Sequence, residues 1–342
     1  MIDRAFVPIY QRLFEFYKER IIKQEYLPGS RVDSINRIIT RHNVSRETAK
    51  LVLNKLSEEG FIIKKAGKGS FVTYTRETQQ VWGVVIPFYS TNIEDLIANL
   101  NNEAQKVDRS VRYFLHYNEP EEEIRLVGNM LRQGYEAVII VPNYDESLTA
   151  DFYRNLNQGN SIVLLVDNTM GGSFFSYVIQ SYDLGVKRAI NYLTYRNDKN
   201  LLFFKNEIWR GRNLVYELME QSIQIFIDQQ APARKLYVIS GLSGFNQEFI
   251  IRNNIGGILC STDIDSLKVT GRLNRWGIKM PDQVSVVSYG NTELTQSATP
   301  SVTAVDCNYG EMAKLTASLI FDCDTKITKQ FVIQPEIIIR QT

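Results

Sequence analysis

The chain has 342 residues, which is long for one ordinary domain and predicts about two. Apolar residues make up 44% of it, a fraction typical of globular proteins, so each domain can bury a core. No segment has the pattern of a secretory leader or a membrane span, which predicts a cytoplasmic protein with no membrane partner. Two histidines and three widely spaced cysteines give little support to a zinc site, histidine catalysis or disulfides, and we expect no metal and no cofactor.

Charge is distributed unevenly along the chain. Residues 1–75 contain 14 Lys/Arg and 8 Asp/Glu, a net charge of +6, whereas the rest of the chain has a net charge of −5. A basic segment joined to an acidic body indicates that only the first part meets nucleic acid. A chance asymmetry on a solvated surface is the alternative interpretation of charge alone.

The first 75 residues have the pattern of three helices followed by a hairpin. Apolar residues recur at helical spacing over residues 8–24. Ser34 and Ser45 are good N-caps for a second and a third helix, and Gly60 ends the third. Two β-like runs within residues 61–74 are separated by a glycine-rich turn. This order predicts an α+β fold, the winged helix-turn-helix.

In a winged helix-turn-helix the third helix enters the major groove with its first turn leading. Arg46 has the donor fork that reads guanine, while Thr48 and Lys50 are placed for phosphate. Lys68, between two glycines at the tip of the hairpin, can approach the minor groove or the DNA backbone. The candidate DNA-contacting residues are Ser34, Asn36, Arg37, Ser45, Arg46, Thr48, Lys50, Lys68 and Gly69. A solvated helix face is the alternative for each charged residue taken singly.

Short stretches across residues 8–72 match a known pattern. They are Pro8-Ile9-Tyr10, Leu27-Pro28-Gly29-Ser30-Arg31, Val44-Ser45-Arg46-Glu47-Thr48, Glu59-Gly60-Phe61-Ile62 and Gly67-Lys68-Gly69-Ser70-Phe71-Val72. The pattern resembles the DNA-binding domain of the GntR family of bacterial regulators, which implies operator DNA as a partner. The usual Pro-Ser-Glu-Arg of that family is replaced by Asp33-Ser34-Ile35-Asn36, with Arg37 adjacent, and a further arginine by Lys50. These departures leave the operator sequence open.

The rest of the chain alternates short apolar runs with helical patterns. Strands are predicted at 81–87, 111–117, 137–142, 161–167, 177–179, 200–205, 235–240, 256–261 and 284–289, and helices at 93–107, 120–133, 147–158, 183–195, 211–228 and 263–275. This alternation predicts parallel, doubly wound sheets, and the length fits two lobes. We therefore divide the chain into a DNA-binding domain at 1–75, a polar linker at 76–81, and a two-lobed α/β domain at 82–342 that binds a ligand and dimerises.

Ligands of parallel sheets bind where the carboxyl ends of strands pass into loops. This rule selects residues 88–92, 143–144, 167–168, 206–212, 262–263, 290–291 and 306. Aromatics that cover a sugar ring and carboxylates, amides and arginines that bind hydroxyls occur together there. The candidate ligand-binding residues are Phe88, Tyr89, Asp167, Asn168, Trp209, Arg210, Arg212, Asp263, Asn291 and Asp306. A helix cap or a core aromatic is the alternative for each of them singly.

A second set of stretches runs from residue 83 to residue 340. They are Gly83-Val84-Val85-Ile86-Pro87, Val163-Leu164-Leu165-Val166-Asp167, Tyr182-Asp183-Leu184-Gly185, Gly257-Ile258-Leu259-Cys260-Ser261-Thr262-Asp263, residues 277–289 and residues 334–340. They resemble the effector domain of the LacI/GalR family, which has the type I periplasmic-binding-protein fold.

The second resemblance implies a sugar effector and a role for particular residues. It implies that Asp263 and Arg212 bind sugar hydroxyls, with Arg210 as a nearby alternative, and that Asp167 lies at a ligand position. The arginine that often follows that aspartate is Asn168 here, and a later aspartate is replaced by Gly290-Asn291, with Asp306 as a substitute acceptor. A GntR-type head on such a domain is similar to the arabinose-repressor architecture. That similarity implies a pentose or 6-deoxyhexose effector, such as arabinose or fucose.

Two other functions are weighed against this one. An enzyme on an α/β fold is the alternative of another class, but residues 87–92 after the first strand contain no glycine for a dinucleotide, and no Gly-x-Ser-x-Gly occurs. A regulator that responds to a nucleobase or an amino acid is the other alternative, which two arginines aimed at the ligand would favour. We predict a homodimeric, ligand-responsive transcription regulator, a repressor, and leave open whether the ligand induces or co-represses.

Overall fold

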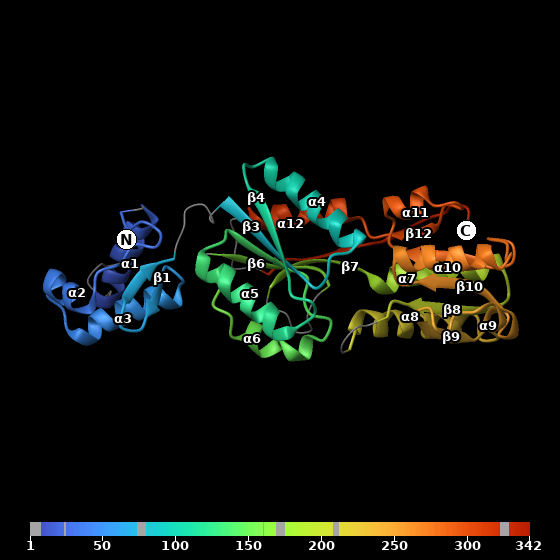
Figure 1. The fold of residues 1–342 in the computed structure, drawn as a ribbon, viewed down its shortest axis with the longest axis horizontal. Coiled ribbons are helices and arrows are strands. Elements are labelled where there is room, and N and C mark those ends of the chain that lie inside the picture. The colour runs from blue at the N-terminus through green and yellow to red at the C-terminus, as the bar shows by residue number, and fades with distance from the viewer. Residues whose placement is uncertain are drawn as a thin grey trace.

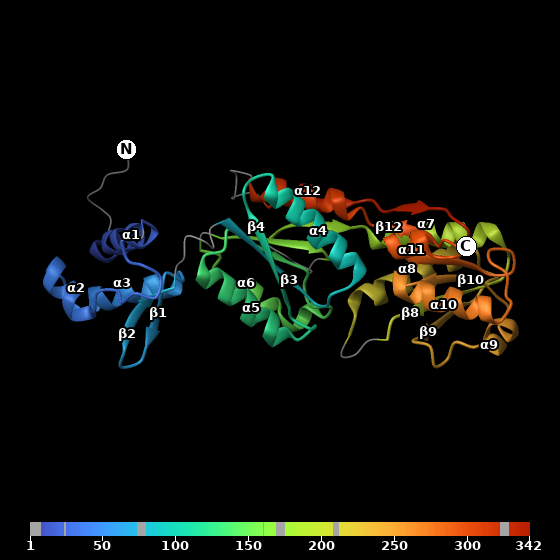
Figure 2. The same cartoon turned by 45° about the horizontal axis from the view of Figure 1, so that its top comes forward.

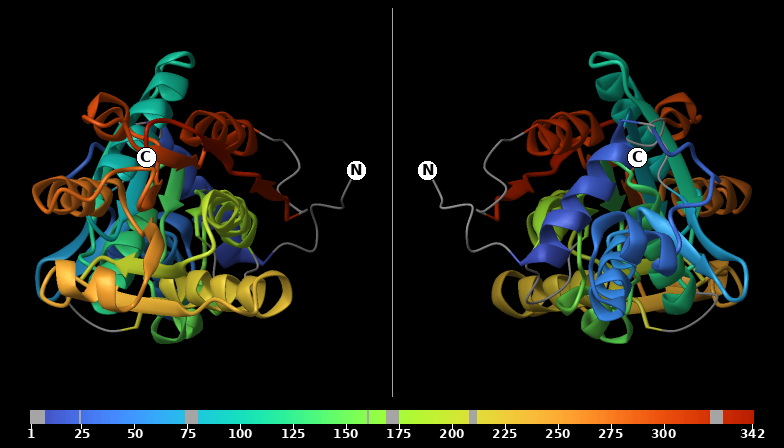
Figure 3. Two further views of the ribbon diagram at one scale, coloured as in Figure 1. Left: turned by 90° about the vertical axis from the view of Figure 1, so that its right-hand side faces the viewer. Right: turned by 90° about the vertical axis from the view of Figure 1, so that its left-hand side faces the viewer.

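The computed structural model describes residues 8–23, 25–73, 80–159, 161–168, 175–207, 212–321 and 328–342. In these ranges the chain forms an N-terminal head (residues 8–73) and two α/β lobes, which lie in a row with the head at one end (Figure 1). A turned view shows the hairpin of the head projecting to one side (Figure 2). Seen along the row, helices surround the strands of the two lobes (Figure 3). No described helix has the length and apolar character needed to cross a membrane.

The head is built from three helices and one antiparallel hairpin. Its elements are α1 (Ile9–Ile22), α2 (Ile35–His42), α3 (Arg46–Glu58), β1 (Ile62–Lys65) and β2 (Gly69–Val72). Ser34 Oγ accepts from the amide of Arg37 and Ser45 Oγ from the amide of Thr48, so both predicted N-caps are confirmed. The apolar faces of the helices pack together and bury Phe14, Tyr17, Ile21, Val32, Ile38, Ala49, Val52, Leu53 and Leu56. The sequence prediction of a winged helix-turn-helix is therefore confirmed.

A buried carboxylate joins the first two helices of the head. The Tyr17 hydroxyl donates to Asp33 Oδ2 at 2.9 Å, and Arg41 Nη1 donates to the same oxygen at 3.1 Å. Burial alone would raise the pKa of Asp33, but the hydrogen bonds from Tyr17 and Arg41 outweigh it and hold that pKa below its usual value. Asp33 stands where the GntR pattern has proline, and here it fixes α2 against α1.

Lobe 1 is a six-stranded parallel sheet with helices on both faces. Its strand order is β13 (Gln330–Ile333), β7 (Ser176–Gln180), β6 (Ile162–Asp167), β5 (Ala137–Ile140), β3 (Val81–Ile86) and β4 (Ser110–Leu115). The helices α4 (Thr91–Gln105) and α12 (Tyr309–Ile320) cover one face, and α5 (Pro120–Gln133) and α6 (Ala150–Arg154) cover the other. Every residue of β3 and β5 is buried, as expected for parallel strands covered on both sides.

Lobe 2 repeats this plan with one antiparallel edge strand. Its order is β14 (Glu336–Ile338), β12 (Thr303–Asp306), β11 (Ser285–Tyr289), β10 (Ile255–Cys260), β8 (Asn200–Lys205) and β9 (Leu236–Ser240), with β14 antiparallel to β12. One face is covered by α7 (Tyr182–Arg196) and α8 (Leu214–Gln230), and the other by α9 (Gln247–Arg252) and α10 (Asp263–Arg275). The short helix α11 (Glu293–Ser297) contacts α10.

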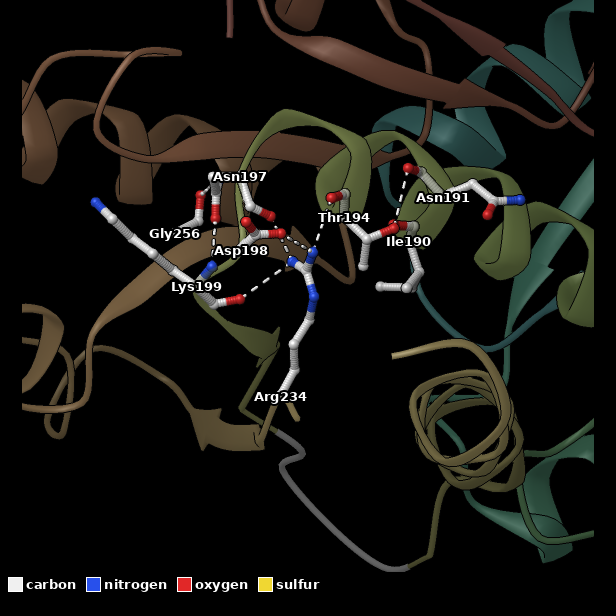
Figure 4. Close-up of polar contacts among 8 residues, drawn as sticks. All are labelled: Ile190, Asn191, Thr194, Asn197, Asp198, Lys199, Arg234 and Gly256. Atoms are coloured by element: carbon white, nitrogen blue, oxygen red, sulfur yellow. Dashed lines mark hydrogen bonds and ion pairs between the residues drawn. The ribbon is translucent and has the colours of Figure 1, made fainter. Parts of the chain in front are cut away.

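One arginine forms hydrogen bonds with the backbone carbonyls at the carboxyl end of helix α7 in lobe 2. Arg234 Nη2 donates to the carbonyl of Thr194 at 2.9 Å, and its Nη1 donates to the carbonyls of Asn197 and Lys199 (Figure 4). The last carbonyls of a helix have no hydrogen-bond partner within the helix, so a guanidinium that donates to such a carbonyl stabilises the helix end.

The chain crosses between the lobes three times. It leaves lobe 1 after β7, returns after β12 to form α12 and β13, and leaves again to form β14. The carboxyl ends of the parallel strands in both sheets therefore face the region of these crossings. The predicted ligand position lies in that region.

Several predicted elements have other bounds in the structure. The helix predicted at 147–158 is a 3-10 turn (Glu146–Leu148) followed by α6, which ends at Arg154 because Asn157 Oδ1 accepts from the amide of Gly159 and forms a turn of its own. The strand predicted to reach residue 117 ends at Leu115. Strand β3 begins at Val81, the last residue predicted for the linker, and residues 74–79 lie outside the described ranges.

Candidate functional site

The predicted DNA-contacting residues lie on the first turns of α2 and α3 and on the hairpin. Asn36, Arg37, Arg46, Lys50 and Lys68 are exposed. The Ser34 and Ser45 hydroxyls are used as helix caps, and the Thr48 hydroxyl lies 2.9 Å from the Ser45 hydroxyl. Gly69 has a φ of 107°, a conformation that strains any residue other than glycine, and a Cβ there would displace the Arg31 side chain. The structure thus leaves the charged candidates accessible to a phosphate backbone.

A cavity of ≈ 860 Å³ lies between the two lobes, at the carboxyl ends of both sheets. This size is within the range of small-molecule sites. Its wall includes residues from five of the seven strand-end segments selected from the sequence, among them Phe88, Tyr89 and Asp167. We call this cavity the pocket.

Tyrosine is the dominant residue of the pocket wall. The tyrosines are Tyr89, Tyr117, Tyr144, Tyr182, Tyr216, Tyr289 and Tyr309. The rings of Tyr182 and Tyr289 are stacked, with centroids 5.7 Å apart and planes inclined by 18°. Such rings present flat apolar faces and hydroxyl tips to one ligand, which suits a molecule with both apolar faces and hydroxyl groups.

Asp167 forms the most buried charged position of the pocket. Its Oδ1 accepts from Gln180 Nε2 at 2.6 Å and from the Tyr309 hydroxyl at 3.3 Å, and its Oδ2 accepts from the Tyr182 hydroxyl at 3.3 Å. Burial raises the pKa of Asp167, although these hydrogen bonds oppose the change. Its φ of 65° is left-handed, which aspartate tolerates better than most residues and which is frequent at functional sites.

Gln180 connects this carboxylate to lobe 2. Its Oε1 accepts from the Tyr289 hydroxyl at 3.1 Å while its Nε2 donates to Asp167, so both ends of the amide are used. Tyr289 lies close to Gly185, where a Cβ would come within 2.6 Å of its hydroxyl oxygen. The network therefore spans lobe 1, the first crossing and lobe 2.

The charged groups of the described pocket wall are all carboxylates. They are Glu119, Asp167 and Glu207, accompanied by the amides Asn92, Asn118, Gln180, Asn206 and Asn213. Among the described residues no lysine or arginine contributes to this wall. An anionic ligand would find no opposite charge there, whereas hydroxyl groups would find acceptors and donors.

Asp263 lies directly behind the pocket wall and joins the lobes. Its Oδ2 accepts from the hydroxyls of Thr91 at 2.5 Å and Thr292 at 2.6 Å, and its Oδ1 accepts from the amide of Ile264. Thr91 begins α4 in lobe 1, so this carboxylate bridges the two lobes. In this arrangement Asp263 is 2% exposed and lies outside the pocket wall, although its neighbours Thr262 and Ile264 contribute to it.

Other predicted ligand residues lie away from the pocket wall. Arg212 is exposed and its Nη2 lies 2.6 Å from Glu217 Oε2. Asn291 Nδ2 donates to Asp306 Oδ2 at 3.0 Å, and its Oδ1 accepts from Arg340. Asn168 is half-buried and does not contribute to the wall. The predicted residues Trp209 and Arg210 lie outside the described residues.

Several pocket residues were not predicted. Tyr117 and Asn118 follow β4, Gln180 ends β7, Tyr182 begins α7, and Tyr309 begins α12. The strand-end rule would have selected Tyr117 and Asn118 if β4 had been given its correct end, and it was not applied to the end of the strand predicted at 177–179. The rule selected Asp306, the last residue of the strand before Tyr309, but not Tyr309 itself.

Behind the pocket, a second buried carboxylate supports the loop that carries Asn143 and Tyr144. Glu123 Oε2 accepts from the amide of Asn143 at 2.7 Å, and its Oε1 accepts from the Tyr153 hydroxyl at 2.5 Å. His116 Nδ1 lies 3.7 Å from Glu123 Oε2. Burial raises the pKa of Glu123 to about 7 and lowers the pKa of His116 to about 4.

These two shifts have opposite effects on stability. Between pH 4.5 and about 7 the folded protein holds more protons on Glu123 than the unfolded chain does, so Glu123 alone makes stability fall as pH rises. Between about 4 and 6.5 the unfolded chain holds more protons on His116, so His116 alone makes stability rise. We expect the two contributions to offset one another over the shared part of the pH range.

Replacing Glu123 with glutamine is expected to remove the contribution of Glu123 to the pH dependence of stability and to leave that of His116. Because the fall in stability caused by Glu123 is then absent, the free energy of unfolding of Glu123→Gln should rise with pH between 5 and 6.5 relative to the unmodified protein, by at most about 1.4 kcal/mol per pH unit. Urea denaturation at a series of pH values measures this difference. Parallel pH profiles for the two proteins would contradict the assignment.

A second cavity, of ≈ 880 Å³, opens on the outer surface of lobe 2. Its wall includes Arg188 and Arg234. The guanidinium groups of both already donate to backbone carbonyls, that of Arg188 to the carbonyl of Pro335 and that of Arg234 to the carbonyl of Asn197. Its residues come from α7, α8, β14 and the segments that directly follow α8 and β14, with none from lobe 1. The pocket between the lobes is therefore the better candidate for a ligand site.

Comparison with known families agrees with this division of the chain. Residues 9–72 match the family described as "Bacterial regulatory proteins, gntR family". Residues 217–342 match the family described as "Periplasmic binding protein-like domain". The two matches correspond to the head and to most of lobe 2 with the returning segments of lobe 1.

Similar proteins extend over nearly the whole chain. The arabinose metabolism transcriptional repressor of Halalkalibacterium halodurans is 22% identical, over 95% of this chain and 94% of its own length. The protein of the same name from Geobacillus stearothermophilus is 20% identical, over 98% of each.

Solved structures confirm the predicted fold of the lobes. The lactose repressor bound to the anti-inducer ONPF has a TM-score of 0.66 at 16% identity, covering 77% of this chain and 99% of that chain. A regulator from Alkaliphilus metalliredigens with D-xylulofuranose has a TM-score of 0.63 at 14% identity, covering 77% and 98%. The chain is therefore a transcription regulator, not an enzyme, in which a helix-turn-helix head that matches gntR-family regulatory proteins is joined to an effector domain that matches periplasmic-binding-protein-like domains.

Proposed function

We propose that this regulator is a sugar-responsive repressor that binds operator DNA through its head and a pentose, or a 6-deoxyhexose such as fucose, through the pocket. Arabinose is the first candidate, because two of the relatives that align over nearly their full length are named as arabinose metabolism repressors, while a third carries the name transcriptional regulator MalR. The observation that carries the proposal is the pocket itself, where tyrosine rings surround the buried carboxylate of Asp167.

The chemistry of the pocket favours a sugar over the other ligand classes. An amino acid carries a carboxylate, and the described wall offers it no cation. A nucleobase could stack on tyrosine, but it would leave most of the carboxylate and amide oxygens without donors, which is unfavourable when they are buried. A sugar supplies several hydroxyl donors together with apolar ring faces.

Within this proposal the candidate residues take different roles. Asp167 accepts hydroxyl donors at the buried end of the pocket, and Phe88 and Tyr89 cover a ring face at the exposed end. Asp263 holds the lobes together behind the ligand through Thr91. A ligand that touches both lobes stabilises their closed arrangement by its differential affinity, which is how it alters the spacing of two heads on DNA.

Calorimetric titration decides between the ligand classes. The full-length protein is titrated with L-arabinose, L-fucose and D-xylose, and in parallel with hypoxanthine, guanine and the common amino acids. We expect micromolar to millimolar binding of one sugar and a shift in affinity for the DNA upstream of the protein's own gene. Binding confined to a nucleobase or an amino acid would replace the sugar proposal, and the absence of any change in DNA affinity would refute the regulatory one.

We also propose a homodimer on a two-fold operator. One winged helix contacts too few base pairs for useful specificity in a genome, so two heads are needed. Analytical ultracentrifugation at micromolar concentration is expected to give a dimer with the effector domains as the main interface. A monomer both free and on DNA would contradict this.

A further inference from the structure

We propose that helix α5 connects the pocket to the DNA-binding head and transmits the state of one to the other. The residues before α5 form part of the pocket wall, and the last turn of α5 contacts the end of the recognition helix α3. This inference rests on the proposed function only in taking the pocket as the effector site. The mechanical connection itself is independent of which ligand binds.

The pocket end of this connection is a strained segment, residues 117–119. All three residues contribute to the pocket wall. Tyr117 and Asn118 have φ values of 54° and 58°, a left-handed conformation that costs a bulky residue such as tyrosine roughly 1–3 kcal/mol and that asparagine tolerates better. Asn143 Nδ2 donates to the carbonyl of Asn118 at 2.7 Å, and the amide of Tyr144 donates to Asn118 Oδ1 at 2.9 Å.

These contacts make residues 117–119 responsive to an occupant of the pocket. Tyr144 contributes to the same wall, so a ligand that moves Tyr144 or Asn118 alters the hydrogen bonds that hold the strained backbone. A strained segment of this kind has a second, relaxed conformation within reach of a few kcal/mol.

Helix α5 is placed to move as one body. It starts at Pro120, directly after the strained segment, and ends at Gly134, whose left-handed φ of 72° closes it. Its buried residues Leu126, Val127 and Met130 pack on the lobe 1 sheet. A helix of 14 residues is about 21 Å long, so its two ends lie on opposite sides of the lobe (Figure 1).

The far end of α5 meets the head at a glycine. Gly60 follows the C-cap of α3, and a Cβ at Gly60 would lie 2.4 Å from Arg132 Cα and 2.5 Å from the Arg132 carbonyl oxygen. The carbonyl of Gly60 accepts from the Thr73 hydroxyl at 2.8 Å, which fixes it to the end of the hairpin. Because backbone meets backbone here, a shift of α5 bears directly on the position of α3.

The arrangement can be tested without any ligand, by a double-mutant cycle in the full-length protein. Tyr117→Gly relieves the strain at the pocket end, and Gly60→Ala pushes the head off α5. Two control variants are available: Asn254 has a φ of 47° in lobe 2, and Gly29 has a φ of 77° in the head with no atom within 4 Å of a Cβ. Gly29→Ala reproduces the backbone effect of Gly60→Ala without the contact to α5, and Asn254→Gly shows what a new glycine at a left-handed position remote from the pocket does by itself.

The readout is the dissociation constant for the DNA upstream of the protein's own gene. We expect Tyr117→Gly to change it by about threefold or more, and Asn254→Gly to leave it within about twofold, the usual limit of additivity for distant sites. The effect of Tyr117→Gly should disappear in the Gly60→Ala background and persist in the Gly29→Ala background. Full additivity of Tyr117→Gly with Gly60→Ala, or no effect of Tyr117→Gly, overturns the proposal.

Hydrogen exchange gives a second measurement that needs neither DNA nor the Gly60 variant. Tyr117→Gly is expected to change amide protection in the last turn of α5 and at residues 59–61, while Asn254→Gly leaves both unchanged. Unchanged protection at both places in Tyr117→Gly also overturns the proposal. If no sugar binds the protein, the proposed effector is wrong, yet both measurements still report on α5.

Discussion

Replacing Asp167 with asparagine is expected to weaken effector binding by about 10- to 150-fold while leaving operator binding unchanged. Asparagine has almost the same shape and tolerates the left-handed backbone at φ 65°, so the change removes the charge and replaces one acceptor oxygen with an amide donor. A hydrogen bond to a charged group contributes roughly 1.5–3 kcal/mol, which sets the size of the loss. Calorimetry with the best sugar measures it.

Asp306→Asn is the matched control. Asp306 also follows a strand and was a candidate from the sequence, but its carboxylate binds Asn291 and the amide of Asn308 outside the pocket wall. We expect the sugar affinity of Asp306→Asn to stay within about twofold of that of the unmodified protein. Because burial raises the pKa of Asp167, acidification should weaken binding to the unmodified protein at a higher pH than an ordinary aspartate would allow. Equal losses of sugar affinity in Asp167→Asn and Asp306→Asn would show that Asp167 has no specific role in binding the sugar.

Replacing Arg46 with alanine is expected to weaken operator binding by about 5- to 150-fold, because one bidentate base contact contributes roughly 1–3 kcal/mol. Arg46 begins the recognition helix and is exposed. The loss should be concentrated at one operator position, which a panel of single base changes reveals by fluorescence anisotropy.

Two other variants separate base reading from charge. Lys50→Ala should weaken all sequences alike and reduce the slope of log affinity against log salt by about 1. Arg12→Ala removes an exposed charge from α1, away from the recognition helix, and should change operator affinity little. If Arg12→Ala and Arg46→Ala had equal effects, Arg46 would act only through its charge.

The fold was largely predictable from the sequence because its signals are local. Serine caps, a glycine at the end of α3 and buried strands between amphipathic helices are each written in a few consecutive residues. The rule that ligands bind at strand ends then led to Phe88, Tyr89 and Asp167 without any structure.

The site was less predictable because its decisive contacts join distant residues. The prediction that Asp263 contacts the ligand did not foresee a hydroxyl from Thr91, 172 residues away, on its carboxylate. Nothing in the sequence around Thr91 or around Asp263 predicts this hydrogen bond, because it depends on how the two lobes are placed against one another. Arg212 is different, since Glu217 five residues later was a visible competitor for its guanidinium.

The three crossings between the lobes also determine the order in which the protein can fold during synthesis. The head is complete once residue 73 has emerged from the ribosome, whereas lobe 1 lacks α12 and β13 until nearly the whole chain is made. Domains generally fold as units and in the order of synthesis, so the DNA-binding head becomes competent long before the part that controls it. A chain that terminates early would therefore retain a folded head that no effector can regulate.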